Sequence, residues 1–275
     1  MTIIAGFQCT DGLLMCSDTE QSFSPSDNKT QTRKVPVFHL GKLTIAIGGS
    51  GDGALVDFIT QDLVKHLAAE DYNWSTIEAG LNNYAKRIFS RHIRVYAGFP
   101  PAFVPEVSFL IAIAMGSQGR LFKWEKNFVY AVPLMQHTSI GIGTIQSEQL
   151  LTEIQFFYPS ELMLFFAVRM MYQVKQLVQG CGGKTEAVFI QVGRELGLVV
   201  HHGIFIVDEI EHVTMMVDEF LVHHVLPLVA NTALSKESVE SQLETAKRGL
   251  MKLRERYGQL MLGSFVKEQE KEEQK

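Results

Sequence analysis

The sequence predicts an α+β protein in which antiparallel sheets carry helices on their outer faces. Short strand-like apolar runs occur in neighbouring groups, and these groups alternate with pairs of helix-like segments. This order favours antiparallel sheets over the single β-α-β crossovers of a parallel sheet. The chain has 275 residues, of which 46% are hydrophobic and 20% are charged, so it can bury a sizeable core.

The first elements are predicted to be strands joined by short turns. Residues 3–9 and 13–17 read as a hairpin whose tight turn ends at Gly12. Residues 19–33 are polar and contain a proline, which predicts a long loop. The runs "KVPVFHL" and "KLTIAIG" are expected to form two further short strands joined through Gly41.

Helix pairs and hairpins alternate over the middle of the chain. Apolar spacing predicts helices at 52–69 and 75–94, the second with Ser75 as its N-cap. A proline-rich loop follows, then a hairpin of "EVSFLIAIAMG" and "RLFKWEKNFVYAV" and a strand at "TSIGIG". Two more helices are expected at about 145–156 and 160–179, before a last hairpin of "EAVFIQVG" and "LGLVVHHG".

The C-terminal segment differs from the rest in its pattern. From Ser235 onward, apolar residues alternate at spacings of four and three, which is a heptad seam. The seam consists of Val239, Leu243, Ala246, Leu250, Leu253, Tyr257 and Leu260. We expect one domain over residues 1–232 and an amphipathic helix with a charged tail over 233–275. Such a helix can pack on its own domain or between subunits, and the pattern leaves both readings open.

Bulk composition argues against several classes of protein. The net charge is −5 and no arginine-rich stripe occurs, so nucleic-acid binding is not expected. Three cysteines, none in a C-x-x-C motif, indicate a reducing compartment. The first residues do not resemble a signal peptide, and apolar runs such as "LMLFFAV" are too short to span a bilayer. We expect a soluble cytoplasmic protein without a membrane partner.

Two motifs that could hold a cofactor are better explained without one. The glycine-rich run at 48–54 fits G-x-G-x-x-A between a strand and a helix, but the parallel strand that a dinucleotide site needs does not follow. The pairs His201–His202 and His223–His224 are sequence neighbours, which chelate poorly together on a strand. No G-x-S-x-G motif supports a serine hydrolase. We expect no cofactor and no metal.

The start of the chain offers a different chemistry. Thr2 is small enough that removal of Met1 is expected, which would leave a threonine with a free α-amine. A threonine hydroxyl is a weak nucleophile unless a base lies beside it, and an α-amine with a pKa near 8 is such a base. Asp18, Lys34 and Gly48 follow at strand ends, which can meet at one rim of a sheet.

These residues and spacings resemble the proteasome β-subunit family, which includes the bacterial protease HslV. Its members are N-terminal-nucleophile (Ntn) hydrolases with a catalytic threonine. The matches, without a gap, are Thr2, Gly12, "SDT" at 17–19, "RKV" at 33–35, "GG" at 48–49 and Asp52. The later segments "SIGIGT" and "GCGGKTEAVFIQVG" are similar to the family more loosely. The resemblance implies a four-layer αββα sandwich, the Ntn-hydrolase fold, followed here by the extra C-terminal helix.

The resemblance also implies a role for each matching residue. Thr2 would be the nucleophile and, through its α-amine, the base. Lys34 would stabilise the hydroxyl oxygen as it becomes negative, and Asp18 would pair with Lys34 and orient it. The N–H of Gly48 would face the developing oxyanion, a contact whose loss typically costs about 10²–10³ in rate.

Substrate-binding positions carry over in the same way. Ser22 and Ser50 would offer backbone groups to an extended peptide, which would add to the protein as a strand. Ala46 matches a position at the base of the family's specificity pocket and, being small, would leave room for a larger side chain. The sequence departs from the family at Ile142, where a serine is frequent, and at Val178, where an aspartate is frequent. Those polar side chains support the terminal amine in the family.

The resemblance therefore implies a threonine endopeptidase that cleaves peptides or unfolded proteins. It also implies a homo-oligomeric ring, which an ATP-dependent unfoldase could feed. Two alternatives remain open: a non-catalytic assembly subunit that keeps the fold, and an Ntn amidase that acts on a small molecule with the same nucleophile.

Overall fold

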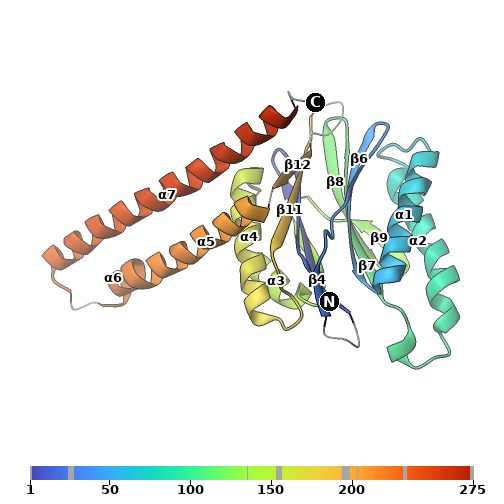
Figure 1. Ribbon diagram of the computed structural model, residues 1–275, viewed down its shortest axis with the longest axis horizontal. Helices are drawn as coiled ribbons and strands as arrows, with labels where there is room; N and C mark the ends of the chain where they lie inside the picture. Colours follow the sequence, from blue (N-terminus) through green and yellow to red (C-terminus); the bar gives the residue numbers. More distant parts are fainter. Residues whose placement is uncertain are drawn as a thin grey trace. The chain divides into compact units, whose positions relative to one another are not determined.

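The computed structural model describes residues 2–23, 28–134, 136–152, 157–193, 199–202, 204–231 and 234–272 (Figure 1). Contacts within the chain define two compact units, Met1–His201 and His202–Lys275. The division lies earlier than the boundary expected after residue 232, because residues that follow the last strand form helices of the second unit.

Two five-stranded sheets form the centre of the first unit. The first has the order β10 (His137–Gly141), β1 (Ile3–Cys9), β2 (Gly12–Asp18), β11 (Thr185–Gln191) and β12 (Val199–His202). The second has the order β5 (Val37–Leu40), β6 (Leu43–Gly51), β7 (Val107–Met115), β8 (Gln118–Glu125) and β9 (Phe128–Ala131). A ribbon of β3 (Glu20–Phe23) and β4 (Asn28–Gln31) lies where a loop was expected, since these short segments pair with each other.

Helices cover the outer face of each sheet, which confirms the expected α+β sandwich. The helices α1 (Gly53–Ala69) and α2 (Ile77–Ile88) lie on the second sheet, and α3 (Thr144–Leu151) and α4 (Ser160–Leu177) lie on the first (Figure 1). The result is four layers in the order helices, sheet, sheet, helices. Asp52 caps α1, because its side chain accepts a hydrogen bond from the N–H of Leu55 at 2.9 Å.

The helix expected at 75–94 is shorter and ends differently. After α2 the chain continues as a π-helical turn (Phe89–Ile93) and short 3-10 turns (Arg94–Tyr96 and Pro101–Phe103). Ser75 is not the N-cap, because its N–H and hydroxyl both donate to the Asn73 side chain and hold a turn before the helix. The end expected for the helix at 145–156 lies outside the described residues.

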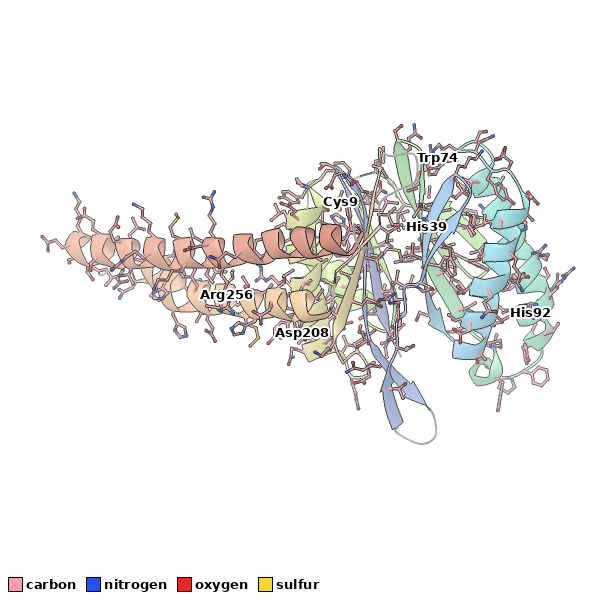
Figure 2. The ribbon with its side chains drawn as sticks, turned by 45° about the horizontal axis from the view of Figure 1, so that its top comes forward. Cys9, His39, Trp74, His92, Asp208 and Arg256 are labelled. Atoms are coloured by element: carbon pink, nitrogen blue, oxygen red, sulfur yellow. The ribbon has the colours of Figure 1, made fainter. Side chains whose placement is uncertain are left out.

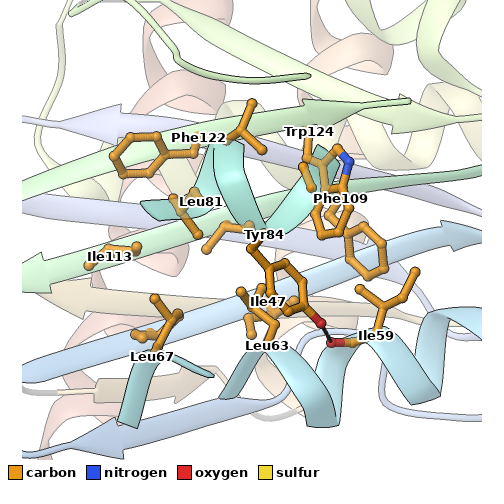
Figure 3. Packing of buried hydrophobic residues seen from close by; sticks show 14 of the residues in the cluster. Ile47, Ile59, Leu63, Leu67, Leu81, Tyr84, Phe109, Ile113, Phe122 and Trp124 are labelled. Carbon is orange, nitrogen blue, oxygen red and sulfur yellow. Dashed lines mark hydrogen bonds between the residues drawn. The ribbon is translucent and has the colours of Figure 1, made fainter. Parts of the chain in front are cut away.

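Alternation along β6 explains why its sequence is apolar on both faces. Ala46 faces the first sheet, in a core between the sheets that also contains Ile4, Met15 and Leu110. Ile47 faces α1 and α2, in a second core shown in Figure 3. A strand buried on both faces is expected to lack the polar alternation of a surface strand.

The hairpin of β1 and β2 determines where the start of the chain lies. The two strands are fully buried, and β1 runs between β2 and β10, with Ile4 opposite Ser17 and Ile140. Thr2, one residue before β1, is therefore held beside the central part of the sheet rather than at its edge.

The second unit is a helical hairpin. It contains α5 (Ile204–Phe220), a π-helical turn (Leu221–Val225), α6 (Leu226–Ala230) and α7 (Lys236–Glu272). Within it, α7 packs against α5, and Arg256 Nη2 lies 3.2 Å from Glu209 Oε2 (Figure 2, where Arg256 is labelled). Only some residues of the heptad seam are buried: Ala246 and Leu253 are buried, whereas Leu243 and Leu250 are exposed.

The sequence pattern did not predict α5, although the segment is strongly apolar. Residues Val207–Ala230 are long and apolar enough to cross a membrane by length and composition alone. Only 11% of this apolar window is buried within the described structure, and length and composition by themselves do not place the segment in a membrane.

Candidate active site

Thr2, Asp18 and Lys34 form one hydrogen-bonded cluster. The hydroxyl of Thr2 donates to Asp18 Oδ1 at 2.7 Å and accepts a hydrogen bond from Lys34 Nζ, also at 2.7 Å. Lys34 Nζ donates to Asp18 Oδ1 as well, at 2.9 Å. Each of the three groups therefore contacts both of the others.

The order of the strands brings these distant residues together. Ile4 lies opposite Ser17, so that Thr2 and Asp18 meet where β1 begins and β2 ends. The N–H of Ile3 donates to Asp18 Oδ1 at 3.0 Å, which ties the start of β1 to this carboxylate. Lys34 comes from the segment between β4 and β5 and reaches the same point from the side.

The charged members of the cluster are removed from solvent. The side chain of Asp18 is 0% exposed and that of Lys34 is 9% exposed. The third donor position of the Lys34 ammonium is filled by the carbonyl of Glu20 at 2.5 Å, and Asp18 Oδ2 accepts the N–H of Gly182 at 3.2 Å. A buried ion pair of this kind is stable only when its remaining hydrogen bonds are satisfied, as they are here.

The cluster combines two features that can activate a hydroxyl, a buried positive charge against its oxygen and an acceptor for its proton. Lys34 places a positive charge against the hydroxyl oxygen, where an alkoxide or an oxyanion would form. The hydroxyl proton points at an acceptor rather than at solvent. The described surroundings supply no competing thiolate, because burial raises the pKa of the nearby Cys181 thiol to about 12 and keeps it neutral.

The strand β10 holds the backbone of Thr2. The N–H of Ile142, just after β10, donates to the carbonyl of Thr2 at 2.9 Å. Gly141 adopts a φ of +100°, and a Cβ at this position would overlap the Thr2 carbonyl oxygen. Glycine is therefore required here by both conformation and space. The side chain of Ile142 is 45% exposed and lines the cavity described next.

A cavity of about 1540 Å³ opens beside Thr2 and extends along β6. One end is formed by Thr2, Lys34 and Ile142, and the other by the segment between α2 and β7. This segment was expected to be a proline-rich loop, and it contributes apolar side chains, including that of Phe99. The cavity is larger than most sites for small ligands, which are about 300–1,000 Å³.

Alternation along β6 decides which glycine faces this cavity. The N–H of Ile47 donates to the carbonyl of Pro36 at 3.1 Å on the β5 side, and the N–H of Asp52 donates to the carbonyl group just before β7 at 3.0 Å. The register with β7 is unbroken between them. Because successive residues alternate across an antiparallel ladder, Gly48 directs its N–H to β7, whereas Gly49 directs its N–H to the open side beyond β5.

The same alternation along β6 decides which of the expected substrate-binding residues face the cavity. Ala46 is buried between the two sheets and does not face the cavity, whereas Ile47 lines it. Ser50 lines the cavity, but by the same alternation its backbone N–H is directed to β7 rather than to the open side where a peptide was expected to bind. Ser22 lies in β3 opposite Lys29, and its side chain lies outside the described residues. Ile47 rather than Ala46 therefore lies in the cavity wall, and Gly49 rather than Gly48 directs its N–H to the open side of β6.

Among the residues that the structure describes, no group of three His, Cys, Asp or Glu side chains is arranged to hold a metal ion. His223 and His224 lie in the exposed π-helical turn of the second unit. His201 and His202 lie in β12, where only the backbone is described.

The fold is that of the proteasome-like N-terminal-nucleophile hydrolases, and solved structures of Anbu, the ancestral β-subunit, share it. Anbu from Yersinia bercovieri matches with a TM-score of 0.61 and 14% identity, over 79% of this chain and 96% of that one. Anbu from Pseudomonas aeruginosa, described as a helical assembly, matches with a TM-score of 0.63 and 13% identity, over 80% and 95%. Anbu from Hyphomicrobium sp. strain MC1 gives 0.57 and 13%, over 79% and 95%.

At 13–14% sequence identity, the similarity to the Anbu structures concerns the fold alone. It supports the broad proteasome-like part of the resemblance and adds nothing specific to HslV. No protein-family model matches the chain, and no curated protein matches its sequence.

Proposed function

We propose that the protein is a threonine-type peptidase whose nucleophile is Thr2, exposed by removal of Met1. The observation that carries this proposal is the cluster in which the Thr2 hydroxyl lies 2.7 Å from both Lys34 Nζ and Asp18 Oδ1. A buried lysine aimed at a threonine hydroxyl is of little structural use, since a buried ion pair is weak support for stability.

In the proposed reaction, Thr2 Oγ1 attacks the carbonyl carbon of the scissile peptide bond. Its proton, which Asp18 Oδ1 accepts in the structure, passes to the α-amine that removal of Met1 sets free. Lys34 stabilises the oxygen of the nucleophile, and Asp18 holds Lys34 in place. The N–H of Gly49, rather than that of Gly48, is positioned to donate to the oxyanion. The leaving amine takes the proton, an ester on Thr2 remains, and water hydrolyses the ester to return the hydroxyl.

The cavity suits a peptide in an extended conformation. Backbone groups of Gly49 and Gly51 face the open side of β6, where a substrate strand can add to the sheet. Ile47 and Phe99 are apolar members of the cavity wall, so we expect a large apolar side chain next to the scissile bond.

We also propose that the protein is a homo-oligomer. Its support is the fold shared with Anbu, which in Pseudomonas aeruginosa is described as a helical assembly. A ring, a cytoplasmic location and an unfoldase partner remain parts of the proposal that rest on the resemblance alone.

A non-catalytic assembly subunit is the second candidate, and one observation favours it. Ile142, whose N–H binds the Thr2 carbonyl, and the neutral thiol of Cys181 lie near the start of β1, and Val178 stands in the sequence where the family frequently has an aspartate. An amine in such surroundings has fewer hydrogen-bonding partners than one supported by serine and aspartate.

Intact mass and peptide hydrolysis separate the two candidates. The peptidase requires a mass that lacks Met1, and it requires hydrolysis of a fluorogenic peptide with a large apolar side chain. Thr2→Ala should abolish hydrolysis, whereas the matched control Thr245→Ala, on the exposed surface of α7, should retain it. Retention of Met1, or hydrolysis that survives Thr2→Ala, would rule out this mechanism.

A further inference from the structure

Arg33 lies one residue before Lys34, at the end of the cavity that contains Thr2. Both basic residues belong to the segment 32–36, which connects β4 to β5 without belonging to either strand. Both line the cavity together with Thr2. The Arg33 side chain therefore borders the same space as the bond that the proposed reaction would cleave.

Glu186 holds the guanidinium of Arg33 from the first sheet. It lies in β11 opposite Ser17, and its Oε1 lies 2.6 Å from Arg33 Nε. The other carboxylate oxygen, Oε2, has no hydrogen-bond partner among the described residues, so the contact is made through one oxygen only. Because the guanidinium is a rigid plane, a contact at Nε also restricts the direction in which its far end points.

Most of the hydrogen-bonding capacity of Arg33 remains available. A guanidinium has five N–H donors, and the contact with Glu186 uses the one on Nε. The two Nη groups carry the other four, and no residue in the described part of the chain pairs with them. The Arg33 side chain is 60% exposed, so a molecule in the cavity can reach these donors. Two Nη groups in one plane match the two oxygens of a carboxylate.

The burial of Glu186 is costly and is not repaid by its ion pair. Its side chain is 8% exposed, but that of Arg33 is 60% exposed, so solvent screens their attraction. Burial raises the pKa of Glu186, which is the sign of a carboxylate that loses more hydration than its neighbours return. A contact that adds little stability is better explained by the orientation that it gives to the guanidinium.

We propose that Arg33, oriented by Glu186, determines specificity by binding a carboxylate of the substrate. This inference rests on the proposed function, because it requires a peptide in the cavity. An unmodified peptide carries carboxylates on aspartate and glutamate side chains and at its free C-terminus, and the guanidinium suits both. Ile47 and Phe99 are assigned to a large apolar side chain, so the carboxylate belongs to another position of the peptide.

The neighbouring lysine does not offer the same site. The three donor positions of the Lys34 ammonium are occupied by Thr2, Asp18 and the carbonyl of Glu20. A second arginine, Arg94, lines the cavity in the segment between α2 and β7, which forms the other end. Replacing Arg94 therefore removes the same charge from the same cavity at a different place.

Binding is measured first, because it does not require activity. Thr2→Ala protein keeps peptides intact, and its affinity for short peptides with one central phenylalanine is compared in pairs. In some pairs glutamate replaces glutamine at one position, and in another a free C-terminal acid replaces an amide. We expect at least one pair to differ by about 10-fold in Kd in favour of the carboxylate, as for a hydrogen bond to a charged group. The pair that differs identifies the source of the carboxylate.

Variants at the two ends of the cavity assign the difference to Arg33. Arg33→Met should abolish it, and Arg33→Lys, which keeps the charge but not the planar fork, should retain only part of it. Arg94→Met should keep most of it. Glu186→Met should reduce it, whereas Glu186→Gln keeps an acceptor for Nε and should preserve most of it. If Glu186→Met does not fold, the Arg33 variants still decide, because they change an exposed side chain.

The possible results separate this inference from the proposed function. Equal binding within every pair, or a difference that persists in Arg33→Met, overturns the inference and leaves the proposed peptidase standing. An undiminished difference in Glu186→Met contradicts the orienting role of Glu186, and a protein that binds no peptide contradicts both proposals. A difference that depends on Arg33, in a protein whose wild type hydrolyses nothing, supports the carboxylate site and contradicts the peptidase. In an active protein the same pairs should differ in KM with kcat nearly equal.

Discussion

Replacing Asp18 with Asn is expected to destabilise the protein strongly while leaving its shape almost unchanged. Three donors converge on Asp18 Oδ1, namely the Thr2 hydroxyl, the Ile3 N–H and Lys34 Nζ, and the N–H of Gly182 reaches Oδ2. An asparagine side chain has one oxygen and one NH₂ group. In either orientation its NH₂ faces at least one N–H donor, and the charge of Lys34 loses its counterion.

The expected cost follows from the burial of the pair. Removing one partner of a buried ion pair typically costs about 3–5 kcal/mol, because the other charge is left uncompensated. Asp18 is 0% exposed and Lys34 is 9% exposed, so solvent cannot replace the lost partner. We therefore expect about 3–5 kcal/mol, a large part of the roughly 5–15 kcal/mol that stabilises a typical protein. In the double variant with Lys34→Met the charge is absent, so the two costs should not add.

Urea unfolding followed by tryptophan fluorescence measures this effect. Both tryptophans, Trp74 and Trp124, lie in the first unit, and Trp124 is fully buried, so the signal reports the unit that contains the site. The double-mutant cycle gives the coupling between Asp18 and Lys34 directly. A cost below about 1 kcal/mol for Asp18→Asn, or additive costs in the double variant, would refute the buried pair as described.

Three further predictions concern groups around the site. Gly141→Ala should lower the free energy of unfolding by about 2 kcal/mol or more, because its φ is +100° and a Cβ would meet the Thr2 carbonyl; an unchanged urea midpoint would contradict this. With a pKa of about 12, Cys181 should be about 10⁻⁴ thiolate at pH 8, so iodoacetamide should add to it only after unfolding, and rapid labelling of the folded protein would show that the thiol is exposed. Burial raises the pKa of Glu186 above its ordinary value of about 4.3, so between the two values the folded state binds more protons than the unfolded state. The stability of the wild type relative to Glu186→Gln should therefore fall as pH rises through this window, and the opposite slope would be inconsistent with a raised pKa.

Much of the fold follows from local pattern. The β1–β2 hairpin, the β5–β6 and β7–β8 hairpins of the second sheet and α1 with its Asp52 cap are each specified by residues close together in the sequence. The pairing of Thr2, Asp18 and Lys34 follows from the resemblance, because spacing alone does not show that three strand ends share one rim. The structure places them within hydrogen-bonding distance.

The other features of the site depend on hydrogen bonds and long-range contacts that the sequence pattern does not show. Successive N–H groups along β6 point to opposite sides, so whether Gly48 or Gly49 faces the open side depends on the direction of one of them. That direction is set by the hydrogen bond from the Ile47 N–H to the Pro36 carbonyl, which the apolar pattern of the sequence does not show. Counting alternation outward from the turn at Gly41 is a signal that could have found it. The ion pair of Glu186 with Arg33 joins residues from distant parts of the chain, so no local motif records it.

The helix α5 was missed for a different reason. Its sequence, "IFIVDEIEHVTMMVDEF", does carry a helical period, because apolar residues recur at spacings of three and four at Val207, Ile210, Val213, Val217 and Phe220, and counting this period could have found the helix. The heptad seam of α7 was recognised, but only part of it is used within the chain, with Ala246 and Leu253 buried and Leu243 exposed.

The nucleophile is tested most directly by covalent labelling of the purified protein with a β-lactone. Ring opening by the Thr2 hydroxyl transfers the whole probe, so the account predicts one added probe mass, located by fragmentation on a peptide that begins with Thr2. Thr2→Ala should show no adduct, and Lys34→Met should react far more slowly. An adduct on any other residue, or none on a chain that has lost Met1, would contradict Thr2 as the nucleophile.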